Sequence, residues 1–299
     1  MKKIVLALGV LSCGSLLWYL FLKPYDYKAT IIAKTFPGTI NQLVKSWGAN
    51  LDNATDIQQE NLRLLRQELV FNDSVHRYQW EITPLTDSTS TIDVYVQDLR
   101  HSPWNRLTLP FRDTDFEKRT RKNLLDFHQL LVDHVKEFRI TLQGMANMEA
   151  TYCACTRFKG HQFDKARGMM KDYPLLGSVL AENNIPLNGT PFLEITYWDM
   201  ARDSIEYDFC FPILKTEGLP QHPEITYREF PEKKALKALY NGNYITSDRS
   251  WYALLEDARK KGLEVTGLPV EVFYTNPNMG GDALRWKAEI FMPIKDDDD

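Results

Sequence analysis

The chain has 299 residues, of which 43% are hydrophobic and 25% charged, as in folded proteins and unlike disordered or fibrous ones. Its 40 acidic and 36 basic residues give a formal net charge of −4, so no overall basic character favours nucleic acid, and we expect no nucleic-acid partner. The length exceeds that of one typical domain. The last four residues, 296–299, are aspartates and are expected to form a solvated acidic tail.

The first segment of the chain is strongly apolar. Residues 4–22 carry no charge and follow two lysines. About 20 apolar residues are enough for a helix to span a bilayer. A cleaved signal peptide and a lipidated Cys13 are alternatives, but the apolar run continues past Cys13 with bulky side chains. The sequence predicts a transmembrane anchor at 1–24, a single-pass protein of the cell membrane, and an extracytoplasmic location for the soluble part.

The next segment, residues 25–139, alternates between strand and helix patterns. Runs with a two-residue period predict strands, Pro37 in a turn predicts a helix start, and an apolar stripe predicts a long closing helix. The expected order is a strand at 25–34, a helix at 37–47, helix-favouring residues at 56–68, strands at 76–82, 91–99 and 104–111, and a helix at 114–138.

This element order, together with the string FPGTINQLVKSW at 36–47, resembles the polyketide-cyclase/START-like (SRPBCC) superfamily. The resemblance implies a helix-grip fold, in which the long last helix lies across a curved antiparallel sheet and a cavity forms between them. The segment contains no catalytic signature of its own.

The second half of the chain contains one pattern twice, at about 140–214 and 224–295. Each copy is predicted as strand, helix, strand, strand. A unit of this size cannot bury its own sheet face, so we expect the copies to form one pseudo-twofold domain at 140–295 with a ligand cleft between them. The corresponding residues are Gly160 and Gly242, Gly189 and Gly267, Glu194 and Glu271, Tyr197 and Tyr274, and Pro212 and Pro293.

The second copy carries the more specific motifs, which are YNGNY at 240–244, GLPVEVFYTNP at 267–277 and EIFMPI at 289–294. On these motifs the region resembles the GyrI-like small-molecule-binding domain, which also serves as the effector domain of many AraC- and MerR-type regulators. The resemblance implies two halves around a central ligand cleft and no cofactor. Nothing before residue 140 resembles a helix-turn-helix, so direct DNA binding is not expected.

The candidate ligand site consists of acidic residues in predicted strands that are otherwise apolar, together with nearby aromatic residues. Glu271 and Glu289 lie among apolar residues, where a buried carboxylate needs a compensating partner. The resemblance to multidrug-binding members implies an acid that attracts a lipophilic cation beside aromatic rings. The alternative for each acid is the solvent face of a half-buried sheet. The candidate ligand-binding residues are Glu271, Glu289, Phe273, Phe291, Tyr240, Tyr244 and Glu194.

Two other functions stay open. Some members of the family hydrolyse reactive electrophiles with an acid and a tyrosine, which would here be Glu271 with Tyr240 or Tyr244. A non-catalytic scaffold is the second alternative. We predict no metal site, because the six histidines are scattered and Cys153 and Cys155 are expected to be small buried apolar residues.

The favoured hypothesis is therefore an α+β, membrane-anchored protein that binds a small lipophilic or cationic molecule and is not an enzyme. Its membrane contact would be the N-terminal helix, and protein partners cannot be named from the sequence.

Overall fold

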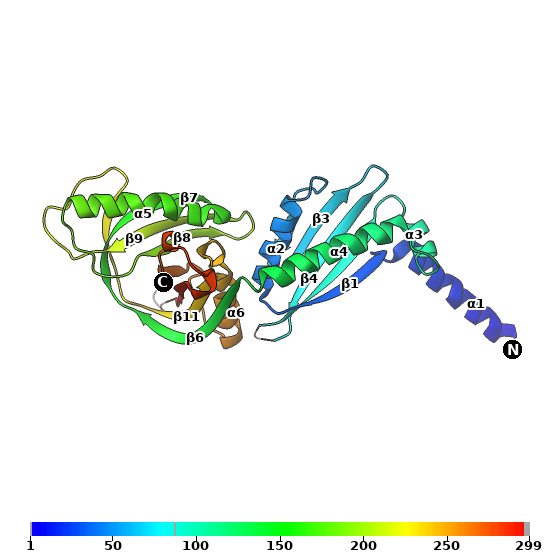
Figure 1. The fold of residues 1–299 in the computed structure, drawn as a ribbon. Coiled ribbons are helices and arrows are strands. Elements are labelled where there is room, and N and C mark those ends of the chain that lie inside the picture. The colour runs from blue at the N-terminus through cyan, green and yellow to red at the C-terminus, as the bar shows by residue number, and fades with distance from the viewer. Residues whose placement is uncertain (1, 87, 296–299) are drawn as a thin grey trace. The chain divides into compact units, whose positions relative to one another are not determined.

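The computed structural model describes residues 2–86 and 88–295, and the predicted acidic tail at 296–299 lies outside them. The described residues form a mixed α+β fold with two antiparallel sheets (Figure 1). The α+β class expected from the sequence is therefore confirmed. The chain divides into two compact units, Met1–Asp133 and His134–Asp299.

The apolar N-terminal segment is helical but does not form the membrane span that the sequence predicted. Helix α1 spans Lys2–Leu17, which is 16 residues, and a π-helical turn, η1, continues over Trp18–Leu22. Across residues 2–86 and 88–295, no helix has both the length and the apolar character to cross a membrane. The predicted transmembrane anchor is therefore wrong, and so is the single-pass membrane localisation.

The first unit contains a five-stranded sheet in the order β1-β5-β4-β3-β2. Trp47, Trp80 and Phe127 meet with ring centroids between 4.7 and 5.7 Å apart. These rings bury helices α2 and α4 against the sheet, which α4 crosses in Figure 1. The elements are β1 (Tyr27–Ala33), α2 (Pro37–Ala49), β2 (Gln58–Asn61), β3 (Leu64–Val70), β4 (Val75–Pro84), β5 (Ser90–Asp98), α3 (Ser102–Thr108) and α4 (Asp115–His134).

Two element predictions in this unit are wrong. Residues 56–68, expected to favour helix, form β2 and most of β3, because Leu65, Gln67 and Leu69 are buried with a two-residue period that overrides helix propensity. Residues 104–111, expected as a strand, contain most of α3, which begins with Pro103 in its first turn. The resemblance to the polyketide-cyclase/START-like superfamily stays a prediction.

A buried ion pair fixes the segment that follows α1. Arg106 of α3 donates from Nε to Oδ1 of Asp26 at 2.6 Å, and the two side chains are 2% and 0% exposed. Arg106 Nη1 also donates to the backbone oxygens of Tyr19 and Leu20. Carbonyls at the end of a helix have no partner within it, so the guanidinium completes the hydrogen bonding of η1.

His76 of β4 should make the first unit sensitive to acid. Its ring packs between Phe71 and Phe116, with centroids 4.5 and 4.8 Å away, and burial lowers its pKa from 6.5 to about 4. Between these pH values the unfolded chain binds a proton at His76 and the folded chain does not. The free energy of unfolding should therefore fall as the pH is lowered from 6.5 to about 4, by up to about 3 kcal/mol.

Urea unfolding at a series of pH values measures this effect. The wild-type protein should lose stability across the window, and His76→Phe, which keeps the ring contacts without a titrating group, should lose correspondingly less. Parallel pH profiles for the two proteins would contradict the prediction.

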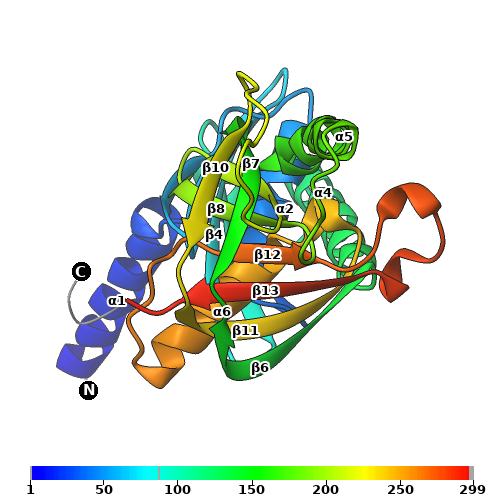
Figure 2. The same cartoon turned by 90° about the vertical axis from the view of Figure 1, so that its left-hand side faces the viewer.

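The second unit contains an eight-stranded sheet in the order β10-β7-β9-β8-β12-β13-β11-β6. In Figure 2, β7 and β10 run steeply across β11, β12 and β13, so the sheet is strongly twisted. The elements are β6 (Phe138–Met148), β7 (Thr151–His161), η2 (Gln162–Asp164), α5 (Lys165–Glu182), β8 (Phe192–Asp199), β9 (Ser204–Pro212), β10 (Thr226–Phe230), β11 (Lys233–Gly242), η3 (Tyr244–Thr246), α6 (Arg249–Lys261), β12 (Val270–Phe273), η4 (Pro277–Met279), η5 (Ala283–Arg285) and β13 (Lys287–Pro293).

The strand order reflects the duplication of the sequence. The first copy consists of β7, α5, β8 and β9, and the second of β11, α6, β12 and β13. Corresponding strands follow in the same order from either end of the sheet, and the copies meet where β8 pairs with β12. The strand before each copy is exchanged, since β6 pairs with β11 and β10 pairs with β7. These pairings tie the two copies into one sheet.

Both long helices bury side chains on the same face of this sheet, which we call the helix face. Helix α5 packs on β7 and β9, and α6 on β11 and β13. Leu176 of α5 and Trp251 of α6 belong to one apolar cluster with Leu193 and Ile290 of the sheet. Helix α5 lies close because Gly168 has no side chain, and a Cβ there would collide with the Tyr207 hydroxyl.

The opposite face of the sheet, which we call the open face, carries the cysteines of β7. Cys153 and Cys155 are both buried there, as their alternation predicts. Cys153 is a free thiol, but Cys155 forms a disulfide with Cys210, its direct neighbour on β9. The expectation of two simple apolar cysteines is therefore correct for Cys153 and wrong for Cys155, whose partner lies 55 residues further along the chain.

Candidate functional site

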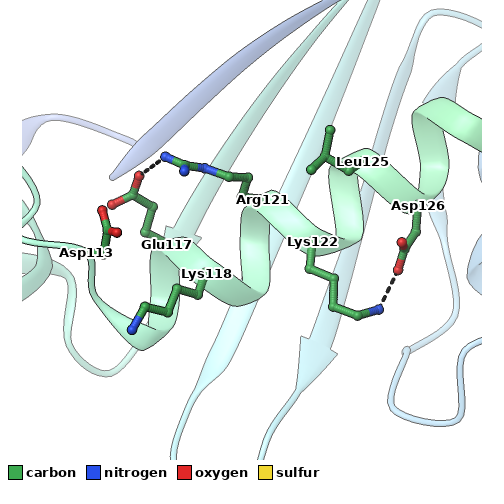
Figure 3. Close-up of a pocket in the computed structure, with 7 residues that line it drawn as sticks. All are labelled: Asp113, Glu117, Lys118, Arg121, Lys122, Leu125 and Asp126. Carbon is green, nitrogen blue, oxygen red and sulfur yellow. Dashed lines mark hydrogen bonds and ion pairs between the residues drawn. The ribbon is translucent and has the colours of Figure 1, made fainter.

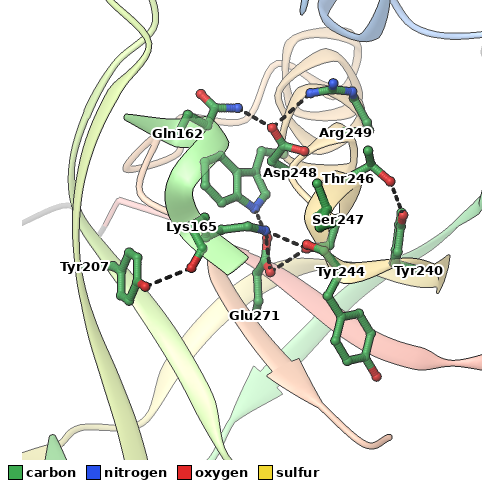
Figure 4. A network of polar contacts seen from close by, with 12 residues as sticks. Gln162, Lys165, Tyr207, Tyr240, Tyr244, Thr246, Ser247, Asp248, Arg249 and Glu271 are labelled. Carbon is green, nitrogen blue, oxygen red and sulfur yellow. Dashed lines mark hydrogen bonds and ion pairs between the residues drawn. The ribbon is translucent and has the colours of Figure 1, made fainter. Parts of the chain in front are cut away.

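A buried carboxylate lies where the two copies meet. Glu271 of β12 is 0% exposed and stands opposite Leu193 of β8. Lys165 Nζ donates to its Oε1 at 2.7 Å and its Oε2 at 2.9 Å (Figure 4). Trp251 Nε1 donates to Oε1 at 2.6 Å, and Ser247 Oγ donates to Oε2 at 2.7 Å. Each carboxylate oxygen thus has two hydrogen-bond donors, and we call these four residues the Lys165–Glu271 site.

The site draws on both copies. Lys165 is the first residue of α5 in the first copy, whereas Ser247 lies just before α6 and Trp251 in its first turn in the second. The amino ends of helices carry a partial positive charge, which favours a carboxylate beside them. The Lys165 ammonium also donates to Ser247 Oγ at 2.6 Å and lies 5.0 Å from the Trp251 ring centroid.

Charge balance in this site depends on its two ionic partners. Burial raises the pKa of Glu271 above its ordinary value, and the Lys165 ammonium opposes that rise through its charge and hydrogen bonds. Lys165, Glu271 and Ser247 are all 0% exposed. Loss of either ion would leave the other buried without compensation, which is among the costliest changes a protein interior can undergo.

A second polar network holds the residues next to the site. Asp248 follows Ser247 and accepts hydrogen bonds from Gln162 Nε2 at 2.5 Å and Arg249 Nη1 at 2.9 Å. Gln162 in turn accepts a hydrogen bond from Trp198 Nε1. Since Gln162 belongs to the first copy, this network joins the amino ends of α5 and α6 and orients the segment that carries Ser247.

Residues 153–295, which contain this site, match the family model described as the GyrI-like small molecule binding domain. This part of the chain is a GyrI-like domain. The resemblance seen in the sequence motifs is thus confirmed for the second unit.

Solved structures with a similar arrangement include the C-terminal domain of EcmrR, at 15% identity and a TM-score of 0.45, with 53% of this chain and 98% of that chain covered. SAV2435 bound to tetraphenylphosphonium shows 10% identity and a TM-score of 0.37 over 52% of this chain and 94% of that one. A hydrolase from Listeria innocua shows 9% identity and a TM-score of 0.34 over 51% and 92%. Among curated proteins, none matches this sequence.

The GyrI-like domain places four of the seven predicted site residues on the helix face. These are Glu271, Phe273, Tyr240 and Tyr244. The Tyr244 ring packs against Phe273 at a tilt, with centroids 4.9 Å apart, and its hydroxyl donates to the backbone oxygen of Lys287. The Tyr240 hydroxyl bonds to Asn243 and Thr246. The two tyrosine hydroxyls are therefore engaged away from the Glu271 carboxylate.

The other three predicted residues, Glu289, Phe291 and Glu194, lie on the open face. The Glu289 carboxylate forms ion pairs with Lys237 and Lys287 and accepts a hydrogen bond from Tyr274. Burial acts to raise the pKa of Glu289, but the hydrogen bonds from these three residues outweigh burial, so the pKa lies below its ordinary value. Glu194 pairs with Arg228 and Lys233. The Glu289 and Glu194 side chains are 13% and 15% exposed; they form ion pairs on the open face and are not brought together with Glu271.

The strand register corrects one correspondence inferred from the sequence. Glu271 pairs with Leu193, and its neighbour Val270 pairs with Glu194. Glu194 therefore points to the open face, so the counterpart of Glu271 on the helix face is Leu193. A shift of one residue moves a side chain to the other side of a sheet. At the position of Glu271 the first copy therefore has a leucine and no acid.

Sequence reasoning missed Lys165, Ser247 and Trp251 as site residues. A signal for two of them was present, because Lys165 follows Gly160 by five residues and Ser247 follows Gly242 by five. Equivalent positions of the two copies therefore approach one carboxylate from both sides. Among the described residues, no group of three or more His, Cys, Asp or Glu side chains is arranged to hold a metal ion.

Two surface depressions lie outside the GyrI-like domain. One of about 290 Å³ runs along α4 and contains the exposed ion pair of Lys122 with Asp126 (Figure 3). The other, of about 680 Å³, follows α1 and η1 beside Trp18 and Tyr19. Neither shares a residue with the Lys165–Glu271 site. The residues that line the first are Asp113, Glu117, Lys118, Arg121, Lys122, Leu125 and Asp126.

Proposed function

We propose that the GyrI-like domain binds a small, largely apolar organic molecule with a positive charge, and that Glu271 is the anion that recognises it. The observation that carries this proposal is the full burial of Glu271 at the junction of the two copies, with a cation already beside it. The family described by the matching model binds small molecules, which supports the same function.

The surroundings of the Lys165 ammonium have the properties of a cation site. A carboxylate lies on one side at 2.7 Å and the Trp251 ring lies 5.0 Å away. A charge pair interacts far more strongly in a buried site than in water, and an aromatic face adds further attraction. A ligand cation that took the place of the ammonium would keep Glu271 compensated. The apolar part of the ligand would contact the cluster that contains Leu193 and Tyr207.

The hydrolase alternative receives no comparable support. It requires a tyrosine hydroxyl beside the acid, so that a reacting atom lies within reach of both. Tyr240 and Tyr244 direct their hydroxyls to Asn243 and Lys287 instead. We therefore propose binding and not catalysis for this site.

The test uses ligand pairs that share a shape and differ in charge. Phenyltrimethylammonium is paired with tert-butylbenzene, and 2-phenylethylammonium with propylbenzene. In calorimetric titrations the wild-type chain should prefer the cation of at least one pair, and Glu271→Gln should abolish that preference by removing the charge that causes it.

The control for folding is the double variant Lys165→Met/Glu271→Gln, in which neither partner is charged. It should also lack the preference while remaining stable. A cation preference that survives in the double variant, or its absence from the wild-type protein, would refute the proposed function.

A further inference from the structure

We infer that Lys165 sets the ligand class of this site, and that the charged group of the ligand is a primary ammonium that replaces the Lys165 ammonium bond for bond. The inference rests on the proposed function and narrows it from organic cations in general to protonated primary amines.

The first argument is the match between donors and acceptors. An ammonium has three N–H donors. Lys165 Nζ lies within hydrogen-bond distance of Oε1 of Glu271 at 2.7 Å, of Oε2 at 2.9 Å and of Ser247 Oγ at 2.6 Å. These three acceptors surround one nitrogen position, so the site is built for three hydrogen bonds from a single atom.

The second argument is burial. Glu271 and Ser247 are both 0% exposed, so water does not replace a lost hydrogen bond there. A quaternary ammonium or a phosphonium brings charge but no N–H donor, and it would leave the acceptors without these bonds. A guanidinium presents its donors in a flat fork, which fits a carboxylate but not three acceptors around one nitrogen. A primary ammonium is the group that restores all three bonds.

The third argument concerns competition. Lys165 is held on α5 and supplies an ammonium at a high effective concentration, so it occupies the position that a ligand needs. Removing its side chain beyond Cβ should leave a narrow space above Glu271. That space corresponds in length and charge to n-propylammonium.

The test is rescue of Lys165→Ala in the full chain by added amines, followed by thermal unfolding. We expect the variant to melt at a lower temperature than the wild-type protein. n-Propylammonium chloride should raise its midpoint in a saturable manner, whereas propyltrimethylammonium chloride and sodium chloride at the same concentration should not. Lys171→Ala, which removes an exposed lysine of the same helix, should show neither the loss nor the rescue.

A second measurement does not depend on the folding of a variant. The wild-type chain should bind 2-phenylethylammonium at least about tenfold more tightly than its N,N,N-trimethyl derivative, since one hydrogen bond to a charged group contributes about this much or more. Equal affinities, or equal rescue of Lys165→Ala by the trimethylated amine, would overturn the inference.

The two proposals fail in different ways. If both cations bind and both depend on Glu271, the proposed function stands and the restriction to primary amines is wrong. If neither cation shows any dependence on Glu271, both the proposed function and this inference are wrong.

Discussion

Lys165→Met should lower the free energy of unfolding of the second unit by about 3–5 kcal/mol. Methionine nearly matches the length of lysine but carries no charge, so Glu271 would remain at 0% exposure without its counter-ion. Ser247 and Trp251 would still donate hydrogen bonds to the carboxylate but cannot neutralise it. Urea unfolding of the full chain measures the loss.

A double-mutant cycle separates charge compensation from packing. Glu271→Gln alone should cost a similar amount, because it leaves the Lys165 ammonium unpaired. The double variant Lys165→Met/Glu271→Gln should recover most of the loss, since no buried charge remains. Lys171→Met, whose lysine is 72% exposed, should change stability by less than about 1 kcal/mol. Additive losses in the cycle would show that the pair is not coupled.

Arg106→Met should destabilise the first unit by about 3–5 kcal/mol. The substitution removes the guanidinium from Asp26, which is 0% exposed at its side chain, and from the backbone oxygens of Tyr19 and Leu20. Ser102 would remain as a hydrogen-bond donor to Asp26 without neutralising its charge. Hydrogen exchange should also become faster at the backbone amides near η1.

The matched control is Arg77→Met on β4. Arg77 pairs with Glu68 at the surface, where the two side chains are 47% and 34% exposed, so its loss should cost less than about 1 kcal/mol. Comparable losses for Arg106→Met and Arg77→Met would contradict the assigned importance of the buried pair. Asp26→Asn combined with Arg106→Met should restore part of the stability, because it removes the uncompensated charge.

Local patterns of the sequence determined much of the second unit. Its duplication and the order strand, helix, strand, strand follow from spacing and apolar periodicity, which act over a few residues. The motif around Glu271 indicated the GyrI-like family, but the apolar neighbours of Glu271 left a buried acid and an acid on the solvent face both open. Patterns over neighbouring residues were therefore enough to predict the repeat and the family.

Which residues distant in the sequence contact one another could be seen only in the tertiary structure. The counter-ion of Glu271 is Lys165, which lies 106 residues earlier, and no local pattern couples two such positions. The strand register placed Glu194 on the open face, because a shift of one residue reverses the direction of a side chain. The same holds for the Cys155–Cys210 disulfide, which depends on the pairing of β7 with β9.

The first unit shows the same division. Alternation of apolar and polar residues in the sequence predicted β4 and β5, and an apolar stripe predicted α4. The burial patterns of these three elements agree with the predictions. The residues within α3 and at the end of α1 did not by themselves predict that α3 is a helix or where α1 ends. Asn105 and Arg106 of α3 bind Asp98 and Asp26, which lie on other segments. The sequence by itself thus determined the elements with a regular apolar period, while the tertiary structure decided those held by long-range polar contacts, because burial turns such contacts into large differences in free energy.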